Sequence, residues 1–252
     1  MIRAARHAAV LLALAAAPLA AQTALVPVGS PDVRTAHLAD RVDSLAVVVD
    51  RVQPYPVGSL VLQTVLVQDA GRDAVLRVET LSDTAGTVAG VDSFTVLRAS
   101  LAPLAYASRV GQKARSIRFE GVRVRGEEVT RGVRKAVDVA LPSLLFDGGT
   151  MDILLGALPL REGYAARLPV YHVDRAAAAS ASVQVLGAER VRTMDGGSCL
   201  AWRIAVAGGP SPGTYWIEER TRALVRHEGT GSPVRLVRRH GCADAPLPQA
   251  SR

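Results

Sequence analysis

Apolar and polar residues alternate along most of this 252-residue chain, from about residue 42 to residue 239. Alternation with a period of two is typical of strands that bury one face, and turn residues interrupt it at intervals that suit antiparallel hairpins. Helical periodicity is nearly absent. The pattern predicts strands over residues 42–52, 59–69, 73–81, 91–99, 115–125, 129–139, 165–173, 182–194, 200–207, 213–219, 223–229 and 233–239.

The buried face changes parity inside the strand predicted over residues 115–125. Ile117 and Phe119 share one face, whereas Val122 and Val124 follow with the other parity after Gly121. A β-bulge at Gly121 would keep both halves facing one core and would bend the sheet. A tight turn at this glycine is the alternative. We take the bulge as an indication of a curved sheet.

One short helix is predicted over residues 150–157. Thr150 is the candidate N-cap, Asp152 lies in the first turn, and Pro159 ends the helix. The apolar residues leave almost no polar face: Met151, Ile153, Leu154, Leu155 and Leu158. A short helix that is apolar all round has to be buried. We expect it against the concave side of a bent antiparallel sheet, where it either completes the core or borders a hydrophobic cavity.

The N-terminus has the pattern of a cleavable secretory signal. Arg3 and Arg6 precede an apolar run of about 13 residues that ends in small side chains. This run is shorter than the roughly 20 residues of a membrane-spanning helix, and no cysteine near the cleavage site would carry a lipid anchor. We predict a signal peptide over 1–22, a loose irregular segment over 23–40, a single β-rich domain over 41–242 and a flexible tail over 243–252. The mature chain, without a transmembrane segment, is expected in the periplasm or secreted.

The composition changes this picture only slightly. Hydrophobic residues make up 49% of the chain and aromatic residues 4%, so the core has to be built mainly from valine, leucine and alanine. The formal charge is +7. For an exported protein the available polyanions are lipid head groups and wall polymers, so we expect no nucleic-acid partner. Arginines such as Arg123 and Arg125 alternate with valine, which indicates solvent-facing strand positions.

Two cysteines, Cys199 and Cys242, lie in the mature part of the chain. An even number of cysteines in an oxidising compartment favours a disulfide. The bridge would tie the C-terminal segment to the strand that begins near Cys199. Two free thiols are the alternative.

The sequence holds no recognisable arrangement of catalytic or metal-binding residues. The histidines of the mature chain stand outside any zinc-ligand spacing, and His172 with Asp174 on one strand face would supply only two ligands. Residues 209–213 match the Gly-x-Ser-x-Gly elbow of serine hydrolases, but Pro212 has no N–H for an oxyanion and a strand follows. Adjacent carboxylates such as Glu127 and Glu128 point to opposite faces of a strand. We therefore predict no catalytic residue, no metal and no cofactor.

Four stretches, residues 92–103, 117–126, 158–164 and 215–226, resemble an uncharacterised family of bacterial envelope proteins, domain-of-unknown-function family 3108. The Trp-Ile-Glu stretch that begins at Trp216 is also similar to a hairpin of the periplasmic lipoprotein carriers and receptors (LolA/LolB-like). The resemblance implies a mainly β fold, in which a strongly curved antiparallel sheet, an unclosed barrel, cups one short apolar helix. It also implies a hydrophobic concave surface, and it implies no catalytic residues.

These observations favour a non-enzymatic periplasmic binding or carrier-like protein for a hydrophobic or amphipathic, lipid-like ligand. Residues of the helix and of neighbouring strands are candidates for the wall of a cavity, although core packing would explain them as well: Met151, Leu154, Leu155, Tyr164, Tyr171, Trp202 and Trp216. The first alternative is a structural or assembly factor that acts through its surface on another envelope protein. The second is a hydrolase whose site is assembled from distant residues.

Overall fold

The computed structural model of the protein describes residues 23–50 and 53–242, so the predicted signal peptide and C-terminal tail lie outside the described residues. Its strands are β1 (Ala24–Leu25), β2 (Arg41–Val49), β3 (Tyr55–Asp69), β4 (Arg72–Asp83), β5 (Val88–Leu97), β6 (Pro103–Val110), β7 (Lys113–Phe119), β8 (Arg123–Thr130), β9 (Val133–Ala140), β10 (Phe146–Asp147), β11 (Ala165–His172), β12 (Ala177–Arg192), β13 (Ser198–Gly208), β14 (Gly213–Glu218), β15 (Leu224–Gly229) and β16 (Val234–Arg238). A 3₁₀ turn, Gly148–Thr150, leads into the helix α1 (Met151–Ala157).

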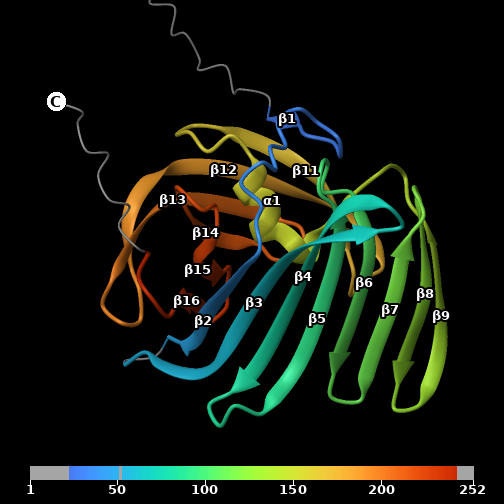
Figure 1. The fold of residues 1–252 in the computed structure, drawn as a ribbon, viewed down its shortest axis with the longest axis horizontal. Coiled ribbons are helices and arrows are strands. Elements are labelled where there is room, and N and C mark those ends of the chain that lie inside the picture. The colour runs from blue at the N-terminus through green and yellow to red at the C-terminus, as the bar shows by residue number, and fades with distance from the viewer. Residues whose placement is uncertain (1–22, 51–52, 243–252) are drawn as a thin grey trace, which may run out of the picture.

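All strands belong to one sheet, and the sheet consists of two runs of hairpins (Figure 1). The first run is β2 to β9 and the second is β11 to β16, each with neighbours that are consecutive in sequence. Antiparallel pairing of β16 with β2 joins the two runs, with Leu45 opposite Arg238. The outer strands β9 and β1 do not pair with each other, while β10 pairs with β11 in parallel. The predicted fold class, an unclosed and strongly curved antiparallel sheet around one short helix, is confirmed.

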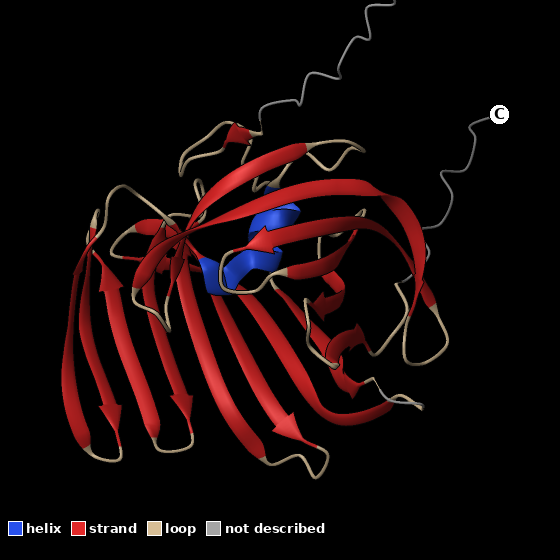
Figure 2. Ribbon diagram, turned by 180° about the vertical axis from the view of Figure 1, so that it is seen from behind, coloured by secondary structure: helices blue, strands red, loops and turns tan. Residues whose placement is uncertain are grey.

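The helix lies inside the curve of the sheet, as the view from behind shows (Figure 2). Every residue of α1 is buried, as its apolar sequence requires. The main core cluster combines α1 with inward-facing residues of both strand runs, for example Leu62, Leu168 and Ile204. The concave side is therefore filled by the helix over much of its area.

Two corrections concern the strands. Residues 103–110 form strand β6, where the sequence analysis predicted none. The strands predicted over 115–125 and 129–139 are in fact three strands, because the chain turns sharply at Gly121 instead of forming a bulge. Gly121 has a φ of 62°, and Glu120 and Arg123 exchange backbone hydrogen bonds across the turn. Bulges do bend the sheet elsewhere, including between Val185 and Gly187.

Two further corrections concern the N-terminal segment and the helix cap. Residues 23–40 are mostly irregular, but Val26, Val33 and Leu38 are buried in the main core cluster. This segment is therefore packed against the domain and is not the loose segment predicted. The backbone N–H of Arg34 donates to the carbonyl of Ala157 at 2.8 Å, which places the segment against the C-terminal end of α1. The Thr150 side chain makes no capping hydrogen bond to α1. Asp147 instead caps the preceding 3₁₀ turn by accepting from the N–H of Gly149.

Candidate functional site

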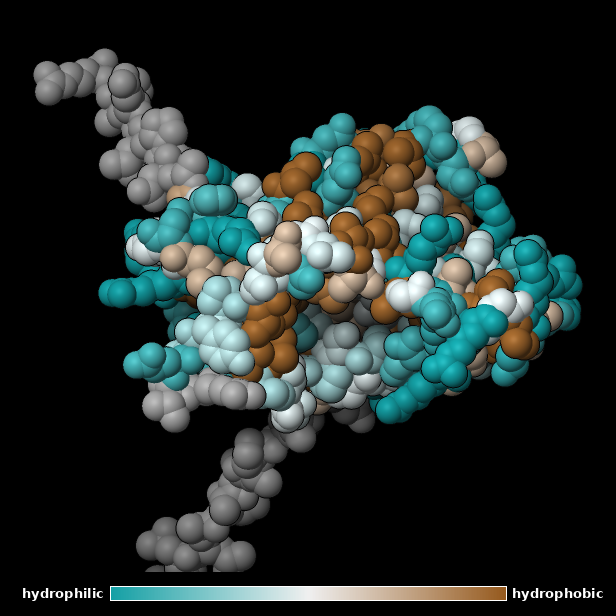
Figure 3. All heavy atoms as spheres, turned by 90° about the horizontal axis from the view of Figure 1, so that it is seen from below, coloured by the Kyte–Doolittle hydropathy of each residue, from teal (hydrophilic) through white to brown (hydrophobic). Residues whose placement is uncertain are grey.

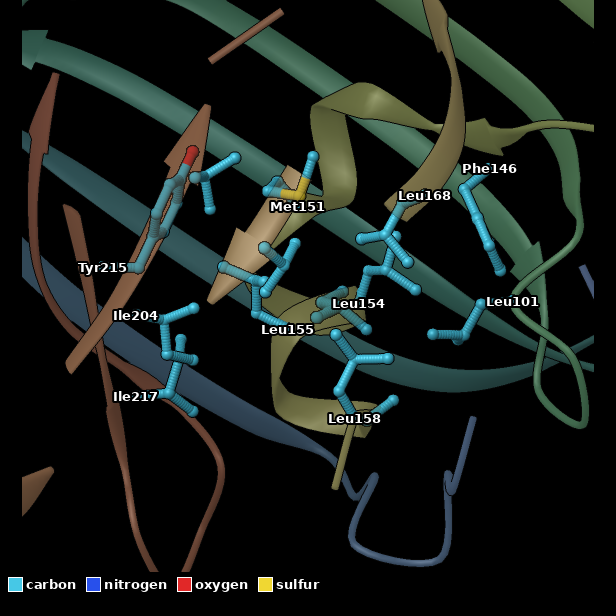
Figure 4. Packing of buried hydrophobic residues seen from close by; sticks show 14 of the residues in the cluster. Leu101, Phe146, Met151, Leu154, Leu155, Leu158, Leu168, Ile204, Tyr215 and Ile217 are labelled. Carbon is cyan, nitrogen blue, oxygen red and sulfur yellow. The ribbon is translucent and has the colours of Figure 1, made fainter. Parts of the chain in front are cut away.

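The helix residues proposed as a cavity wall are packed into the core. Met151, Leu154 and Leu155 are at most 2% exposed and contact inward-facing residues of the sheet (Figure 4). The space left beside Met151 is a cleft of about 100 Å³, bordered also by Tyr215 and His227, whose rings stack at 4.1 Å. This volume is below the 300–1,000 Å³ of typical small-molecule sites. Beside Met151 the concave face is a core with a small gap.

The four aromatic residues of the predicted wall lie in different places. Trp202 packs against the main core cluster, and Tyr164 belongs to it, with its hydroxyl 3.3 Å from a carboxylate oxygen of Asp32. Tyr171 belongs to a second cluster together with Phe119. Trp216 lies in a third cluster with the two cysteines, and its indole N–H donates to Glu189 at 2.6 Å. The structure therefore brings the three helix residues, Tyr164 and Trp202 together, and it separates Tyr171 and Trp216 from them.

A charged network crosses the core, and no pattern in the sequence predicted it. Arg77 on β4 is 1% exposed, donates to the hydroxyl of Thr64 at 2.7 Å and forms an ion pair with Asp152 of α1. Its Nε lies 3.5 Å from an oxygen of Glu79. The ion pair attaches the helix to the sheet, since Asp152 is the only charged residue of α1.

Polar side chains follow one row of the concave face across six strands. Register pairs join Glu79 to Asp92, Asp92 to Ser108, Ser108 to Arg115, Arg115 to Glu128, and Glu128 to Lys135 on β9. We call these six residues the polar row. The next row on the same face is more apolar and includes Phe94, Tyr106, Ile117 and Val137. The inner face thus changes from apolar to polar along the strands.

Two carboxyls near the β4–β5 end of the polar row, those of Glu79 and Asp147, have raised pKa values. Burial raises the pKa of Glu79 to about 7, against the opposing effect of the Arg77 guanidinium. Burial also raises the pKa of Asp147 to about 7, although this side chain accepts from the N–H of Gly149. A cleft of about 230 Å³ beside them is bordered by Glu79, Asp92 and His172. Asp92 accepts from the hydroxyl of Tyr106 at 3.0 Å.

A larger cleft lies at the other end of the polar row. This cleft, called here the end cleft, has a volume of about 410 Å³ and lies between strands β7 to β9 and the turn from β11 to β12. Its apolar lining comes from both sides of the opening in the sheet: Ile117, Val137, Val139, Tyr171 and Val173. The ring of Tyr171 contacts the ring of Phe119 edge-on, with centroids 5.4 Å apart. Of the predicted wall residues, Tyr171 lines this cleft.

Charged residues form the rest of the end cleft: Lys113, Arg115, Glu128, Lys135, Asp138, Asp174 and Arg175. Arg115 is 10% exposed at its side chain and bridges the cleft, because its Nη1 donates to the carbonyl of Val173 at 2.8 Å. Its Nε donates to Glu128 at 2.9 Å, and this hydrogen bonding lowers the pKa of Glu128. The cleft therefore has an apolar wall and a charged wall, a combination suited to an amphipathic molecule. Figure 3, the view from below Figure 1, shows hydrophobic residues gathered in the middle of that face, with hydrophilic residues around them.

The model of family DUF3108, described as a protein of unknown function, matches residues 52–236. This chain belongs to the DUF3108 family.

Two solved structures are similar to this DUF3108 chain at low identity. One is a β-barrel-like protein of the DUF1849 family from Brucella abortus, with 11% identity, a TM-score of 0.42, and coverage of 82% of this chain and 96% of the other. The other, from Bacteroides fragilis NCTC 9343, is described as having a YmcC-like fold, with 11% identity, a TM-score of 0.34, and coverage of 78% and 92%. No curated protein matches the sequence.

The disulfide and the motif noted in the sequence can be located in the DUF3108 chain. Cys199 and Cys242 form a disulfide, as predicted. The Gly-x-Ser-x-Gly match lies in the hairpin loop between β13 and β14. In the described part of the chain, no three His, Cys, Asp or Glu side chains are grouped to hold a metal ion. None of the helices described is long and apolar enough to span a bilayer.

Proposed function

We propose that this DUF3108 protein is a non-enzymatic, carrier-like binding protein of the cell envelope, periplasmic or secreted, and that it holds an amphipathic, lipid-like ligand in the end cleft. The observation that carries the proposal is the cleft itself. Its volume of about 410 Å³ lies within the range of small-molecule sites, and its apolar wall stands beside charged groups. The helix surface, which the sequence favoured as the cavity wall, is already covered by protein.

The volume of the cleft provides a direct test. Val137 lines the cleft and is only half-buried, so Val137→Trp should fill the space without disturbing the main core. Val133, on the same strand, is 72% exposed and is not part of the lining, so Val133→Trp is the matched control. Binding of 1-lauroylglycerol would be measured by isothermal titration calorimetry. We expect Val137→Trp to weaken binding by about tenfold or more and Val133→Trp to leave it unchanged.

Two results would contradict the proposal. One is a wild-type protein that binds no lauroylglycerol and carries no lipid in native mass spectrometry after purification from the envelope. The other is equal binding by Val137→Trp and wild type, which would place the ligand elsewhere.

A further inference from the structure

The two lysines of the chain both line the end cleft. Lys113 and Lys135 are the only lysines among 30 lysine and arginine residues, and they lie on β7 and β9, the two strands that flank β8, on the same curved face. Arg115 and Arg175 line the cleft as well. Four cationic side chains therefore converge on one concave space, which is unlike the alternation of exposed arginines on the outer strand faces.

The carboxylates of the cleft do not balance these cations. Glu128 is bonded to Arg115 and lies 3.5 Å from the ammonium of Lys113, and Asp174 lies 3.6 Å from Arg115. Asp138 alternates with the lining valines of β9, and both its carboxylate oxygens accept from Arg123 at 2.6 and 2.7 Å. Because Asp138 is paired with Arg123, which is not part of the lining, only Glu128 and Asp174 oppose the four cations. An excess of two positive charges therefore remains in the cleft.

Lys135 and Arg175 carry this excess. Within residues 23–50 and 53–242, no hydrogen bond or ion pair engages either side chain. Lys135 lies opposite Glu128 in the β8–β9 register, but Arg115 already occupies that carboxylate. Cations without a partner, on concave surfaces with apolar walls, attract an anion more strongly than they would on an open surface.

The cationic and apolar parts are ordered along the cleft in the same direction on both walls. On β9 the lining runs from Val139 through Val137 to Lys135. On the opposite wall it runs from Tyr171 through Val173 to Arg175. The walls are aligned because Tyr171 contacts Phe119, whereas the carbonyl of Val173 accepts from Arg115, four residues earlier on β7.

From this order we infer that the end cleft selects an amphiphile with an anionic head group, a phosphate or a carboxylate, which Lys135 and Arg175 bind while the tail lies against the valines and Tyr171. The inference rests on the proposed function and adds the charge of the ligand. The head group would sit at the cationic end of both walls. The neutral equivalent of the same ligand would keep the tail contacts and lose the ionic ones.

The test compares three probes by isothermal titration calorimetry: 1-lauroyl-lysophosphatidate, 1-lauroylglycerol, which lacks only the phosphate, and inorganic phosphate. Lys135→Gln and Arg175→Gln should each weaken lysophosphatidate binding about fivefold, and the double variant more than tenfold. Neither should change lauroylglycerol binding. Arg118→Gln is the matched control, because Arg118 is an exposed cation on the other face of β7.

The outcomes separate this inference from the proposed function. Equal affinity for the two lauroyl probes, or a lysophosphatidate affinity that survives the double variant, overturns the inference while lauroylglycerol binding upholds the carrier proposal. Inorganic phosphate that binds as tightly as lysophosphatidate also overturns it, since the tail then contributes nothing. Failure to bind either lauroyl probe contradicts both.

Discussion

Arg77 places a positive charge among the apolar side chains of the core. Its two terminal nitrogens are paired with Thr64 and Asp152 and its Nε lies 3.5 Å from Glu79, while burial removes both charges of the ion pair with Asp152 from water. A buried ion pair adds little net stability, but removal of one partner leaves an uncompensated charge. The energetic role of Arg77 is therefore visible only when the pair is broken.

Arg77→Met should lower the free energy of unfolding by about 3–5 kcal/mol, because Asp152 is left buried without its partner. The double variant Arg77→Met with Asp152→Leu should recover much of the loss. Urea unfolding followed by circular dichroism gives both values. If the double variant is as unstable as the sum of the two single variants, the ion pair does not act as a unit.

The raised pKa of Asp147 makes stability depend on pH. Its folded-state pKa of about 7 exceeds the ordinary value of 3.8, so the folded protein holds this proton more tightly than the unfolded chain does. The free energy of unfolding should therefore decrease as the pH rises from about 4 to about 7, and this contribution should be constant above that range. Glu79 acts in the same direction, with a folded-state pKa also near 7.

Asp147→Asn retains an oxygen that can accept from Gly149 and removes the titration, so its stability profile between pH 5 and 8 should be flatter than that of wild type. Urea midpoints across this range give the comparison. Asp195→Asn serves as a control. This carboxylate accepts hydrogen bonds from the Thr193 hydroxyl and from the N–H groups of Gly197 and Gly241, which lower its pKa to about 2, outside the range of pH 5 to 8. Parallel profiles for wild type and Asp147→Asn would show that Asp147 does not titrate there.

The residues of the end cleft were only partly predictable from the sequence. Tyr171 was included because aromatic residues often line cavities. Lys135 and Arg175 are 40 residues apart in sequence and belong to different runs of hairpins, so no local pattern brings them together. Arg77 follows the same alternation as exposed arginines, and its partner Asp152 is 75 residues away.

At the scale of elements, the helix is fitted closely to the sheet at its N-terminal end. A Cβ added at Gly149 would lie 2.2 Å from Cε1 of Phe94 on β5, and a Cβ at Gly148 would lie 2.2 Å from Cγ of Pro210. These glycines allow the 3₁₀ turn to approach both neighbours. Larger residues there would have to displace the turn or the aromatic ring.

Gly149→Ala should lower the free energy of unfolding by about 1–3 kcal/mol, because the added methyl overlaps the ring of Phe94. In a protein that also carries Phe94→Leu, Gly149→Ala should lower the free energy of unfolding by less than it does in wild type. The measurement is a double-mutant cycle by urea unfolding. Simple additivity of the two changes would show that the contact with Phe94 is not the cause.

Most strands and the helix follow from their sequence pattern, and the exceptions have physical reasons. Strand β6 begins at Pro103 and carries small residues such as Ala105 and Ala107, so its two faces differ little in hydrophobicity. The tight turn at Gly121 and a bulge there produce the same change of parity in sequence. The irregular segment over 23–40 is held by buried valines and a leucine too far apart to form a periodic pattern.

At the scale of the whole molecule, the disulfide attaches the end of the described chain to the sheet. Cys242 follows β16 and is bridged to Cys199 on β13, across 43 residues of sequence. The bridge lies in the same cluster as Trp216 and Val225. It therefore fixes the segment after β16 against the face of the sheet that lies away from α1.

Removal of the bridge by Cys199→Ala with Cys242→Ala should lower the free energy of unfolding by about 4 kcal/mol in the chain-entropy model. Wild type in reductant should show the same urea midpoint as this variant in either condition. The variant without reductant and wild type without reductant complete the comparison. A wild-type midpoint that reductant does not change would mean that the bridge is absent in solution or adds no stability.

The pairing of β16 with β2 has a consequence for the order of folding. Each run of hairpins joins strands that are close in sequence, whereas this pairing places Leu45 beside Arg238, almost the full length of the domain away. While the chain folds, the first run can form its hairpins from neighbouring segments, but β2 stays at an open edge until β16 pairs with it. The last strand of the described chain is therefore the one that protects the first long strand from pairing with another molecule, and slow completion of β16 would leave that edge exposed to aggregation.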